Sequence, residues 1–474
     1  MHPAEAALLA LYYAVLVILA VYGAHRLHLV RLRRRLPPPA RPAAGLWPPL
    51  TVQLPLYNEP NVAARLIDAV AALAYPGRLD IQVLDDSTDE TPSIVAQRAA
   101  YWSARGVAIA HIRRGSREGY KAGALAEGLG RSDAELFAVF DADFVPPRDA
   151  LLRIVPAFAD PRIGMVQARW THLNREQSLL TRVQALYLDA HFAVESAARN
   201  FGGRFFNFNG TAGIWRRAAI EEAGGWSSST LTEDLDLSYR AQLAGWEFAF
   251  LCDVEIPAEL PAALSGFQDQ QHRWAKGSLQ TARKLVGSIV ASDLARPVKT
   301  EALFHLTNNV AYLLTLVLAL LIVPAILLRY EYGILWTFAI DFVLFAVSSG
   351  SILVFYREGQ RWAGRPLPRW RELLAVLPVG VGMSVRNAAA VIEGLVQRGG
   401  HFHRTPKAGD AMRVARERRL RLPMAEMALA LFFAGVLIAF AAAGRWGSLP
   451  FLGLFAGGYG LMVVLSLNER FSTT

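Results

Sequence analysis

The residues best suited to chemistry lie in segment 267–277, Phe-Gln-Asp-Gln-Gln-His-Arg-Trp-Ala-Lys-Gly. In a helix, Gln270, Arg273 and Trp274 share one face, because residues three and four apart are neighbours on a helical surface. That face offers an amide, a planar cation and an aromatic ring, which together suit a phosphate and a sugar ring. The pattern also fits an amphipathic surface helix with an Asp269–Arg273 ion pair and a buried tryptophan.

Two carboxylates, Asp141 and Asp143, follow an apolar run at residues 136–140 that reads as a strand. Residues two apart at a strand end can emerge on the same side, and two close carboxylates repel unless a cation lies between them. Mg²⁺ or Mn²⁺ held by these acids and by substrate phosphates fits this pattern, and it would stabilise a departing diphosphate. Acids that cap a helix are the alternative.

A second pair of acids, Asp85 and Asp86, follows the apolar run at residues 81–84, where ordinary turn chemistry would also account for them. Lys121 begins a predicted helix of small residues at 119–125. A cation there could lie near phosphates, although a surface lysine with an extended side chain fits equally well.

A third acidic cluster, Thr232, Glu233 and Asp234, opens another predicted helix. Thr232 could be the N-cap, with the acids complementing the helix dipole. Asp234 could instead deprotonate an alcohol, which requires a carboxylate within contact range of the acceptor hydroxyl. No second carboxylate nucleophile stands out, which favours single inversion over double displacement.

The composition indicates an integral membrane protein of two or three domains. The chain has 474 residues, 53% of them hydrophobic, with several long apolar runs. The formal net charge of +9 does not indicate nucleic acid, because the basic residues cluster beside the apolar runs, as the positive-inside rule and anionic headgroups would explain. The single cysteine, Cys252, excludes an internal disulfide and a cysteine metal site.

Short apolar runs alternate with helical patterns between residues 50 and 256, which predicts an α/β domain with a largely parallel sheet. The predicted strands are 50–57, 81–84, 107–112 and 136–140. Ligands collect at the carboxyl ends of strands in such sheets. These ends carry an unusual density of carboxylates.

Five apolar runs are predicted to cross a membrane, with the α/β domain on the cytoplasmic side. A sixth run, 373–396, is interrupted by proline and charged residues and is interpreted as an interfacial or re-entrant helix. The expected organisation is a first transmembrane helix (1–24), a basic Pro-rich linker (25–49), the α/β domain (50–256), interface helices (257–302), transmembrane helices 2 and 3 (303–356), an interface helix with a loop (357–423), transmembrane helices 4 and 5 (424–468) and a tail (469–474).

Taken in order, Asp85-Asp86, Asp141-x-Asp143, Thr232-Glu233-Asp234 and Gln270-x-x-Arg273-Trp274 resemble the processive family 2 glycosyltransferases of the cellulose synthase type. Similarity is greatest to the plant cellulose-synthase-like β-mannan and β-glucan synthases, through the segments 166–170, 208–213 and 231–239. The resemblance covers nearly the whole chain. It implies a GT-A fold, a nucleotide-diphosphate sugar as donor, a divalent metal, and a growing polysaccharide that is extruded across the cell membrane.

The resemblance also assigns roles by position. Asp85, Asp86, Lys121, Asp141, Gln270 and Arg273 would bind the donor, and Asp141 and Asp143 the metal. Asp234 would be the general base, beside Glu233 and Thr232. Trp274, Trp170, Asn209, Gly210 and Thr211 would lie against the acceptor.

One segment departs from the family pattern. Segment Phe402-His-Arg-Thr-Pro-Lys407 resembles the gating loop of such synthases but differs from its usual form, Phe-x-Val-Thr-x-Lys. A non-processive transferase to a lipid acceptor, similar to ceramide glucosyltransferases, is the nearest alternative, and a transporter is less favoured because its paired broken helices are missing. The sequence leaves open whether the donor is GDP-mannose or UDP-glucose.

Overall fold

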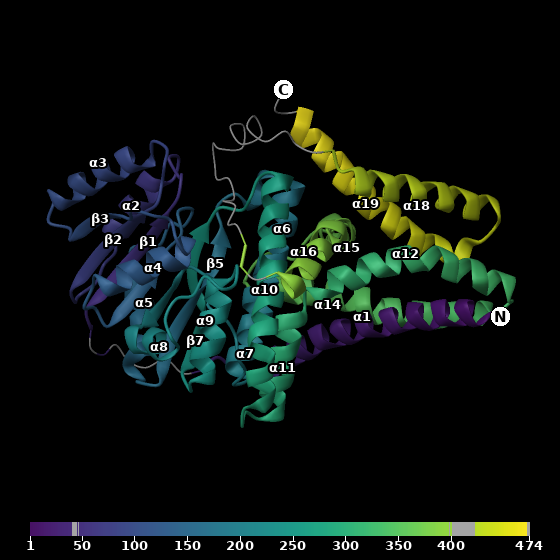
Figure 1. The fold of residues 1–474 in the computed structure, drawn as a ribbon, viewed down its shortest axis with the longest axis horizontal. Coiled ribbons are helices and arrows are strands. Elements are labelled where there is room, and N and C mark those ends of the chain that lie inside the picture. The colour runs from purple at the N-terminus through teal and green to yellow at the C-terminus, as the bar shows by residue number, and fades with distance from the viewer. Residues whose placement is uncertain (40–44, 46, 398, 401–421, 472–474) are drawn as a thin grey trace.

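The computed structural model describes all residues except 40–44, 46, 398, 401–421 and 472–474. A sheet flanked by helices and a bundle of long apolar helices lie at opposite ends of the molecule, with α6, α10 and α11 between them (Figure 1). The predicted loop at residues 402–407 lies outside the described residues.

A seven-stranded mixed sheet forms the α/β half, in the order β3-β2-β1-β4-β6-β5-β7. β6 pairs antiparallel with both β4 and β5, and the other neighbouring pairs are parallel. The strands are β1 (Leu50–Leu56), β2 (Leu79–Asp85), β3 (Ile109–Arg113), β4 (Leu136–Val139), β5 (Ile163–His172), β6 (Gly213–Arg216) and β7 (Glu247–Ala258). β1 lies inside the sheet and is buried on both faces, which explains its nearly continuous apolar sequence.

Helices cover both faces of this sheet. One face packs a core with residues of α2, α3 and α5, and the other packs a core with residues of α4, α8 and α9. The helices are α2 (Ala63–Ala71), α3 (Thr91–Ser103), α4 (Tyr120–Gly130), α5 (Ala150–Ile154), α8 (Arg217–Glu222) and α9 (Glu233–Leu243). α4 and α9 each begin beside the carboxyl ends of the strands, so they bring Lys121 and Asp234 to that edge.

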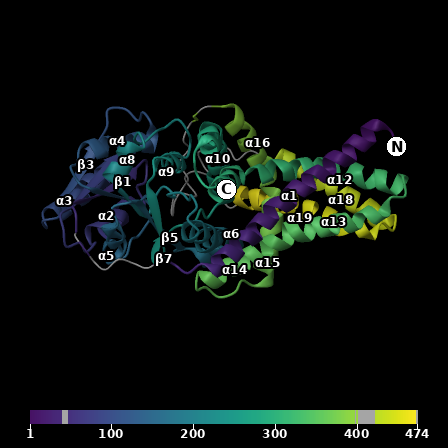
Figure 2. The same cartoon turned by 90° about the horizontal axis from the view of Figure 1, so that it is seen from below.

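A layer of helices separates the sheet from the bundle (Figure 2). It comprises α6 (Leu179–Ala190), the π-helical segment η3 (His191–Ser196), α7 (Ala197–Phe201), α10 (Leu264–Ala291) and α11 (Arg296–Thr307). α10 carries the Gln-x-x-Arg-Trp segment.

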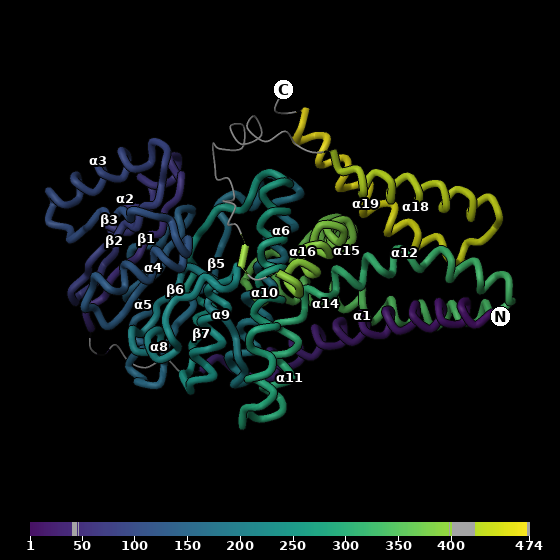
Figure 3. Tube along the Cα trace, viewed as in Figure 1, coloured from purple at the N-terminus to yellow at the C-terminus, as the bar shows by residue number. Residues whose placement is uncertain are grey.

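Five helical segments in the described part of the chain are long and apolar enough to cross a membrane: α1 (Pro3–Arg35), α12 (Val310–Glu331), η4–α14 (Leu335–Trp362), α18 (Met424–Ala442) and η6–α19 (Trp446–Phe471). The third of these includes α13 (Phe338–Phe345), η5 (Ala346–Gly350) and α14 (Ser351–Trp362). Two further helices, α15 (Trp370–Gly382) and α16 (Ser384–Val396), are bent by 51° relative to each other. The N-terminus lies at the end of the bundle remote from the sheet (Figure 3).

Two boundaries differ from those expected from sequence. α1 continues as a helix to Arg35, because its basic last turn suits the negative end of the helix dipole. The residues from Leu303 to Thr307 belong to α11 rather than to the second span, because a turn at Asn308 and Asn309 separates α11 from α12. Apolar sequence alone did not reveal that turn.

Candidate active site

Two adjoining cavities lie where the sheet meets the helix bundle. The sheet cavity contains the strand-end acids and is lined among others by Asp86, Lys121, Asp141, Asp143 and Arg273. The bundle cavity, about 410 Å³, extends between the long apolar helices. Of the residues that the structure describes, seven line both cavities: Trp170, Leu188, Asn209, Thr232, Asp234, Gln270 and Trp274. These residues form the junction between the two cavities.

The acids after β4 lie beside a lysine. Lys121 Nζ is 2.5 Å from Asp141 Oδ1 and donates to the carbonyl of Gly210 at 2.8 Å. Burial lowers the pKa of Lys121, but Asp141, Glu233 and other nearby carboxylates outweigh burial and leave that pKa raised. The ammonium is therefore charged, and it faces the cavity where a phosphate could bind.

Asp141 and Asp143 could hold a divalent cation. Both line the sheet cavity, and Asp143 is buried, so the pair provides oxygen ligands in a confined site. The described residues contain no cluster of three or more His, Cys, Asp or Glu side chains able to hold a metal. A hard cation at this pair would therefore need further oxygen ligands from the substrate, which is how Mg²⁺ commonly binds with phosphates.

Asp234 has the environment of a general base. Its carboxylate lies at the junction, in the first turn of α9. Burial, reinforced by the negative charge of Glu233, raises the pKa of Asp234 to about 7, against the opposing effect of Lys121. A carboxylate with a pKa near neutrality accepts a proton more readily than an ordinary aspartate does.

Gly210 allows the chain to pass close to Asp234. Its φ of +81° lies in the left-handed region that favours glycine. A Cβ at this position would lie 3.0 Å from Asp234 Oδ2 and 3.5 Å from Lys121 Nζ. The segment containing Gly210 therefore forms a wall of the site against both side chains.

The three residues of the Gln-x-x-Arg-Trp segment lie on α10, and each lines at least one of the two cavities. Gln270 and Trp274 line both cavities, and Arg273 lines the sheet cavity. Burial lowers the pKa of Arg273, while the nearby acids Glu233 and Asp141 oppose this effect. On an adjacent face of α10, Asp269 and Gln268 bind Arg386 of α16.

Two of the predicted site residues do not line either cavity. Asp85, the last residue of β2, is buried. One of its carboxylate oxygens accepts a hydrogen bond from the backbone N–H of Ser87 at 2.9 Å, and the other lies 2.9 Å from His111 Nε2. Thr211 is also buried, and its hydroxyl accepts a hydrogen bond from the backbone N–H of Asp141. Both residues hold the loops that carry neighbouring site residues.

A cation–aromatic pair in the sheet cavity was not predicted from sequence. The Arg117 guanidinium lies 3.3 Å from the ring centroid of Tyr57, and both residues line the cavity together with Asp86. Asp86 is in turn bound by Arg114, which follows β3. This group offers a flat surface and an acid to a nucleobase. The only local indication in the sequence was an aromatic residue, Tyr57, directly after β1.

The π-helical segment η3 was also not predicted. π-turns within helices are rare and frequently occur at functional sites. Here His191 and Glu195 line the bundle cavity, His191 Nδ1 lies 3.0 Å from Glu195, and His191 Nε2 lies 2.9 Å from Asn209 Oδ1. Apolar periodicity gives no indication of a π-turn.

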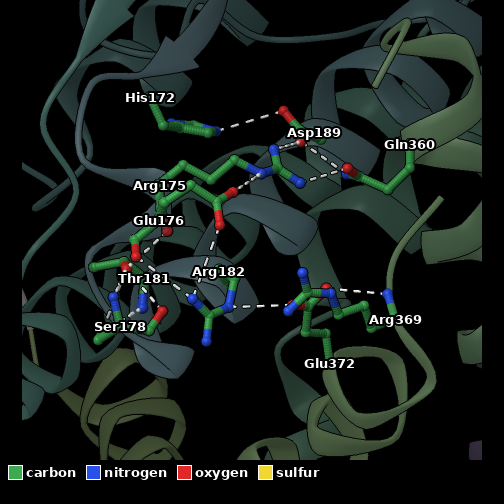
Figure 4. A network of polar contacts seen from close by, with 10 residues as sticks. All are labelled: His172, Arg175, Glu176, Ser178, Thr181, Arg182, Asp189, Gln360, Arg369 and Glu372. Atoms are coloured by element: carbon green, nitrogen blue, oxygen red, sulfur yellow. Dashed lines mark hydrogen bonds and ion pairs between the residues drawn. The ribbon is translucent and has the colours of Figure 1, made fainter. Parts of the chain in front are cut away.

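A polar network joins the sheet cavity to the end of the third apolar segment (Figure 4). His172 lines the cavity, and its Nε2 lies 3.5 Å from Asp189 Oδ1. Arg175 and Gln360 of α14 both bind the other carboxylate oxygen of Asp189. A second ion pair, Arg182 to Glu372 of α15, lies beside it.

The chain is similar to known glycosyltransferases. Residues 48–277 match the family described as "Glycosyltransferase like family 2". "Glucomannan 4-beta-mannosyltransferase 2" of Arabidopsis thaliana is 46% identical over 53% of this chain and 48% of its own length. "Glucomannan 4-beta-mannosyltransferase 1" of Cyamopsis tetragonoloba is 40% identical over 61% of this chain and 57% of its own.

A longer match comes from "Probable glucomannan 4-beta-mannosyltransferase 3" of Oryza sativa subsp. japonica, which is 36% identical over 73% of this chain and 68% of its own length. The chain spans about half of the length of the first two relatives. Among solved structures, a mannosyltransferase from Pyrobaculum calidifontis in complex with GDP-Man and Mn²⁺ matches with a TM-score of 0.57 at 22% identity, covering 82% of this chain and 99% of that chain. The predicted GT-A fold is confirmed.

Proposed function

We propose that this chain, which belongs to the cellulose-synthase-like branch of glycosyltransferase family 2, transfers mannose from GDP-mannose to a growing β-linked polysaccharide. In the same proposal, the protein moves that polymer across a membrane. The names of the relatives favour mannose as the sugar. UDP-glucose is the other donor that the sequence leaves open.

The observation that carries this proposal is that Asp234 and Trp274 both lie at the junction of the two cavities. Both residues line the cavity that contains the strand-end acids and also the cavity that extends between the apolar helices. A sugar chain in the bundle cavity would therefore end beside the candidate base and the candidate donor site. A transferase that releases a soluble product has no need for such an arrangement.

In the proposed reaction, Asp234 takes the proton from the terminal hydroxyl of the acceptor. That oxygen attacks the anomeric carbon of the donor sugar from the opposite face, and the bond to the diphosphate breaks, so the configuration inverts. Lys121 and Arg273 would hold the departing diphosphate by charge-assisted hydrogen bonds. Gln270 would add an amide contact, and the Trp274 ring would support the acceptor sugar.

Asp141 and Asp143 would hold a divalent cation, Mg²⁺ or Mn²⁺, when the donor binds. The metal would neutralise negative charge on the diphosphate. The structural neighbour, whose fold is similar, contains Mn²⁺ with GDP-Man. Asp86 would bind the nucleoside, beside Tyr57 and Arg117.

In this proposal, residues 50–256 form the catalytic domain on the cytoplasmic side of the cell membrane. The five long apolar segments cross the bilayer, and the bent α15–α16 pair lies at the interface. The basic end of α1 at Arg33, Arg34 and Arg35 supports this orientation, because cytoplasmic flanks are enriched in basic residues.

The test uses purified protein in liposomes, supplied with GDP-mannose or UDP-glucose. We expect GDP release and a polymer that elutes ahead of oligosaccharides on gel filtration. Asp234→Asn should lower the transfer rate by roughly 10²–10⁴, as expected for loss of a general base. Asp133→Asn makes the same chemical change at an 80% exposed side chain and should leave the rate unchanged.

A product that carries a single mannose on a lipid would overturn the polymer assignment. Transfer at the wild-type rate by Asp234→Asn would overturn the assignment of the base. Release of UDP from UDP-glucose, without release of GDP from GDP-mannose, would show that the transferred sugar is glucose and not mannose.

A further inference from the structure

A buried charged group lies in the helix bundle at the end remote from the sheet. Arg329, near the end of α12, has no exposed surface, and Asp341 in α13 is only 3% exposed. Tyr12 of α1 is 2% exposed beside them. Charged side chains within transmembrane segments are expensive and usually mark a functional site.

The group is incompletely satisfied. Asp341 Oδ2 accepts hydrogen bonds from the Tyr12 hydroxyl at 3.0 Å and from Arg329 Nη1, and Arg329 Nε donates to the carbonyl of Ala325 at 3.0 Å. Asp341 Oδ1 and Arg329 Nη2 are buried and have no hydrogen-bond partner among the described residues. One acceptor and one donor therefore remain, and leaving such groups unpaired in a buried site is costly.

Two members of this group line the same cavity as the candidate active site. Tyr12 and Asp341 line the bundle cavity, which Asp234 and Trp274 also line at the junction. Along α1 the cavity-lining residues recur every three to four positions from Tyr12 to Arg26, which at about 1.5 Å per residue is roughly 21 Å. That length is most of the ~30 Å hydrocarbon thickness of a bilayer.

The chemistry of the group selects a neutral polyol. An anion would be repelled by Asp341, and a cation by Arg329. A hydroxyl can donate from the cavity to the remaining Asp341 oxygen, while Arg329, which is fully buried and does not line the cavity, holds the carboxylate in place. Phe345 and Phe451, whose rings lie 5.2 Å apart, line the cavity nearby and offer apolar surfaces to the faces of sugar rings.

We propose that Asp341, positioned by Arg329, forms a carbohydrate-binding site at the remote end of the bundle cavity, where it binds hydroxyls of the polysaccharide before the polymer leaves the bilayer. This inference rests on the proposed function. Binding there would hold the leading end of the chain while sugars are added at Asp234. The site would therefore raise the number of sugars that are added before the polymer dissociates.

The main test replaces the charged pair by the apolar pair Arg329→Met/Asp341→Leu. Exchanging both members of a buried ion pair for apolar residues commonly preserves stability, unlike removal of one member. We expect the mean product length in liposomes to fall severalfold. The affinity for manno-oligosaccharides long enough to reach the site should fall at least tenfold, and the affinity for a disaccharide should not change.

The matched control is Glu5→Gln/Tyr332→Phe. It removes a polar pair at the same end of the bundle, where the Tyr332 hydroxyl donates to Glu5 at 2.7 Å and neither residue lines the cavity. This variant should make polymer of wild-type length. Equal length and affinity in the double variant and the control would overturn the proposal.

A second measurement does not depend on how the variant folds. Wild-type protein is incubated with a manno-oligosaccharide that carries a photoreactive group at its leading end. Labelling of peptides from α13 supports the site, and labelling confined to the segments around Asp234 overturns it. A wild type that transfers no mannose to a short acceptor would instead refute the proposed function itself.

Discussion

Gly277 of α10 lies against Thr232, so closely that a Cβ at position 277 would be 2.5 Å from Thr232 Cγ2 and 2.6 Å from its hydroxyl. Gly277 lies one turn after Arg273 and Trp274 on the same helix. Thr232 immediately precedes Glu233 and Asp234. This contact therefore sets the distance between the helix that would hold diphosphate and acceptor and the residue that would act as base.

Gly277→Ala should separate these two elements. We expect a loss of transfer activity of at least tenfold, together with destabilisation of about 1–3 kcal/mol, because overpacking shifts the backbone. Gly287→Ala is the matched control on the same helix, where an added Cβ would meet no atom of the described part of the chain within 4 Å. It should keep full activity and raise the thermal midpoint slightly, because alanine favours helix over glycine. Full activity in Gly277→Ala would show that the contact does not position the base.

The pH dependence of transfer should follow Asp234. Its pKa of about 7 predicts that kcat/KM rises with pH up to about 7 and then levels off, because only the carboxylate accepts a proton. Lys121 lowers this pKa, so Lys121→Met should move the acid limb to higher pH, besides weakening donor binding. Lys299→Met, a change at a partly exposed lysine of α11 that lines neither cavity, is the control. If the acid limb of the kcat/KM profile did not shift in Lys121→Met, that limb would report the titration of a group other than Asp234.

Asp234 should also reduce stability above neutral pH. Its pKa in the folded protein lies above the ordinary value of 3.8, so the folded state binds the proton more tightly than the unfolded state does. The resulting stabilisation is fully present below about pH 4 and is lost as the pH rises through about 7. Asp234→Asn carries no charge to bury, so its thermal midpoint should exceed that of the wild type at pH 8 by several degrees. Equal midpoints at pH 8 would contradict a raised pKa.

The Tyr57–Arg117 pair should bind the nucleobase of the donor. Tyr57→Ala removes one face of this surface and should raise KM for GDP-mannose about tenfold, or ~1.4 kcal/mol, with a smaller change in kcat. Tyr57→Phe keeps the ring and should remain close to wild type. Tyr101→Ala, at an exposed tyrosine whose ring Arg105 contacts, is the control outside the cavity. An unchanged KM in Tyr57→Ala would place the base elsewhere.

The sequence predicted the parts of the site that depend on local pattern. Apolar runs end at the carboxylates, and helical spacing groups Gln270, Arg273 and Trp274, so the positions of these side chains follow from strand and helix geometry. The structure brings Trp274 and Asp234 to one junction, which spacing alone could not establish because they lie on different elements. Only the resemblance of the ordered motifs to those of a known family predicted that these two residues belong to one site.

Other parts depend on tertiary packing and gave no local signal. Asp85 and Asp86 are adjacent, yet only Asp86 reaches the cavity, because successive side chains of an extended segment point to opposite sides. The antiparallel insertion of β6 arises from long-range pairing with β4 and β5. The contact between Gly277 and Thr232 likewise joins segments that are far apart in the chain.

Asp189 should couple the catalytic domain to the helix bundle through Arg175 and Gln360 (Figure 4). Although burial alone would raise the pKa of Asp189, the neighbouring His172 and Arg175 together lower it below its ordinary value. Asp189→Asn keeps the shape but weakens these bonds, so we expect destabilisation by about 1.5–3 kcal/mol at pH 7. Asp133→Asn, at an exposed aspartate, should have no comparable effect.

The sign of the pH dependence separates this role from simple packing. Because the folded-state pKa of Asp189 is lowered, its contribution to stability is present above about pH 4 and is lost as the pH falls toward the folded-state pKa. The difference in thermal midpoint between wild type and Asp189→Asn should therefore shrink below pH 4. A difference that is constant from pH 3 to pH 8 would show that shape, and not the charge on Asp189, holds α14 against the catalytic domain.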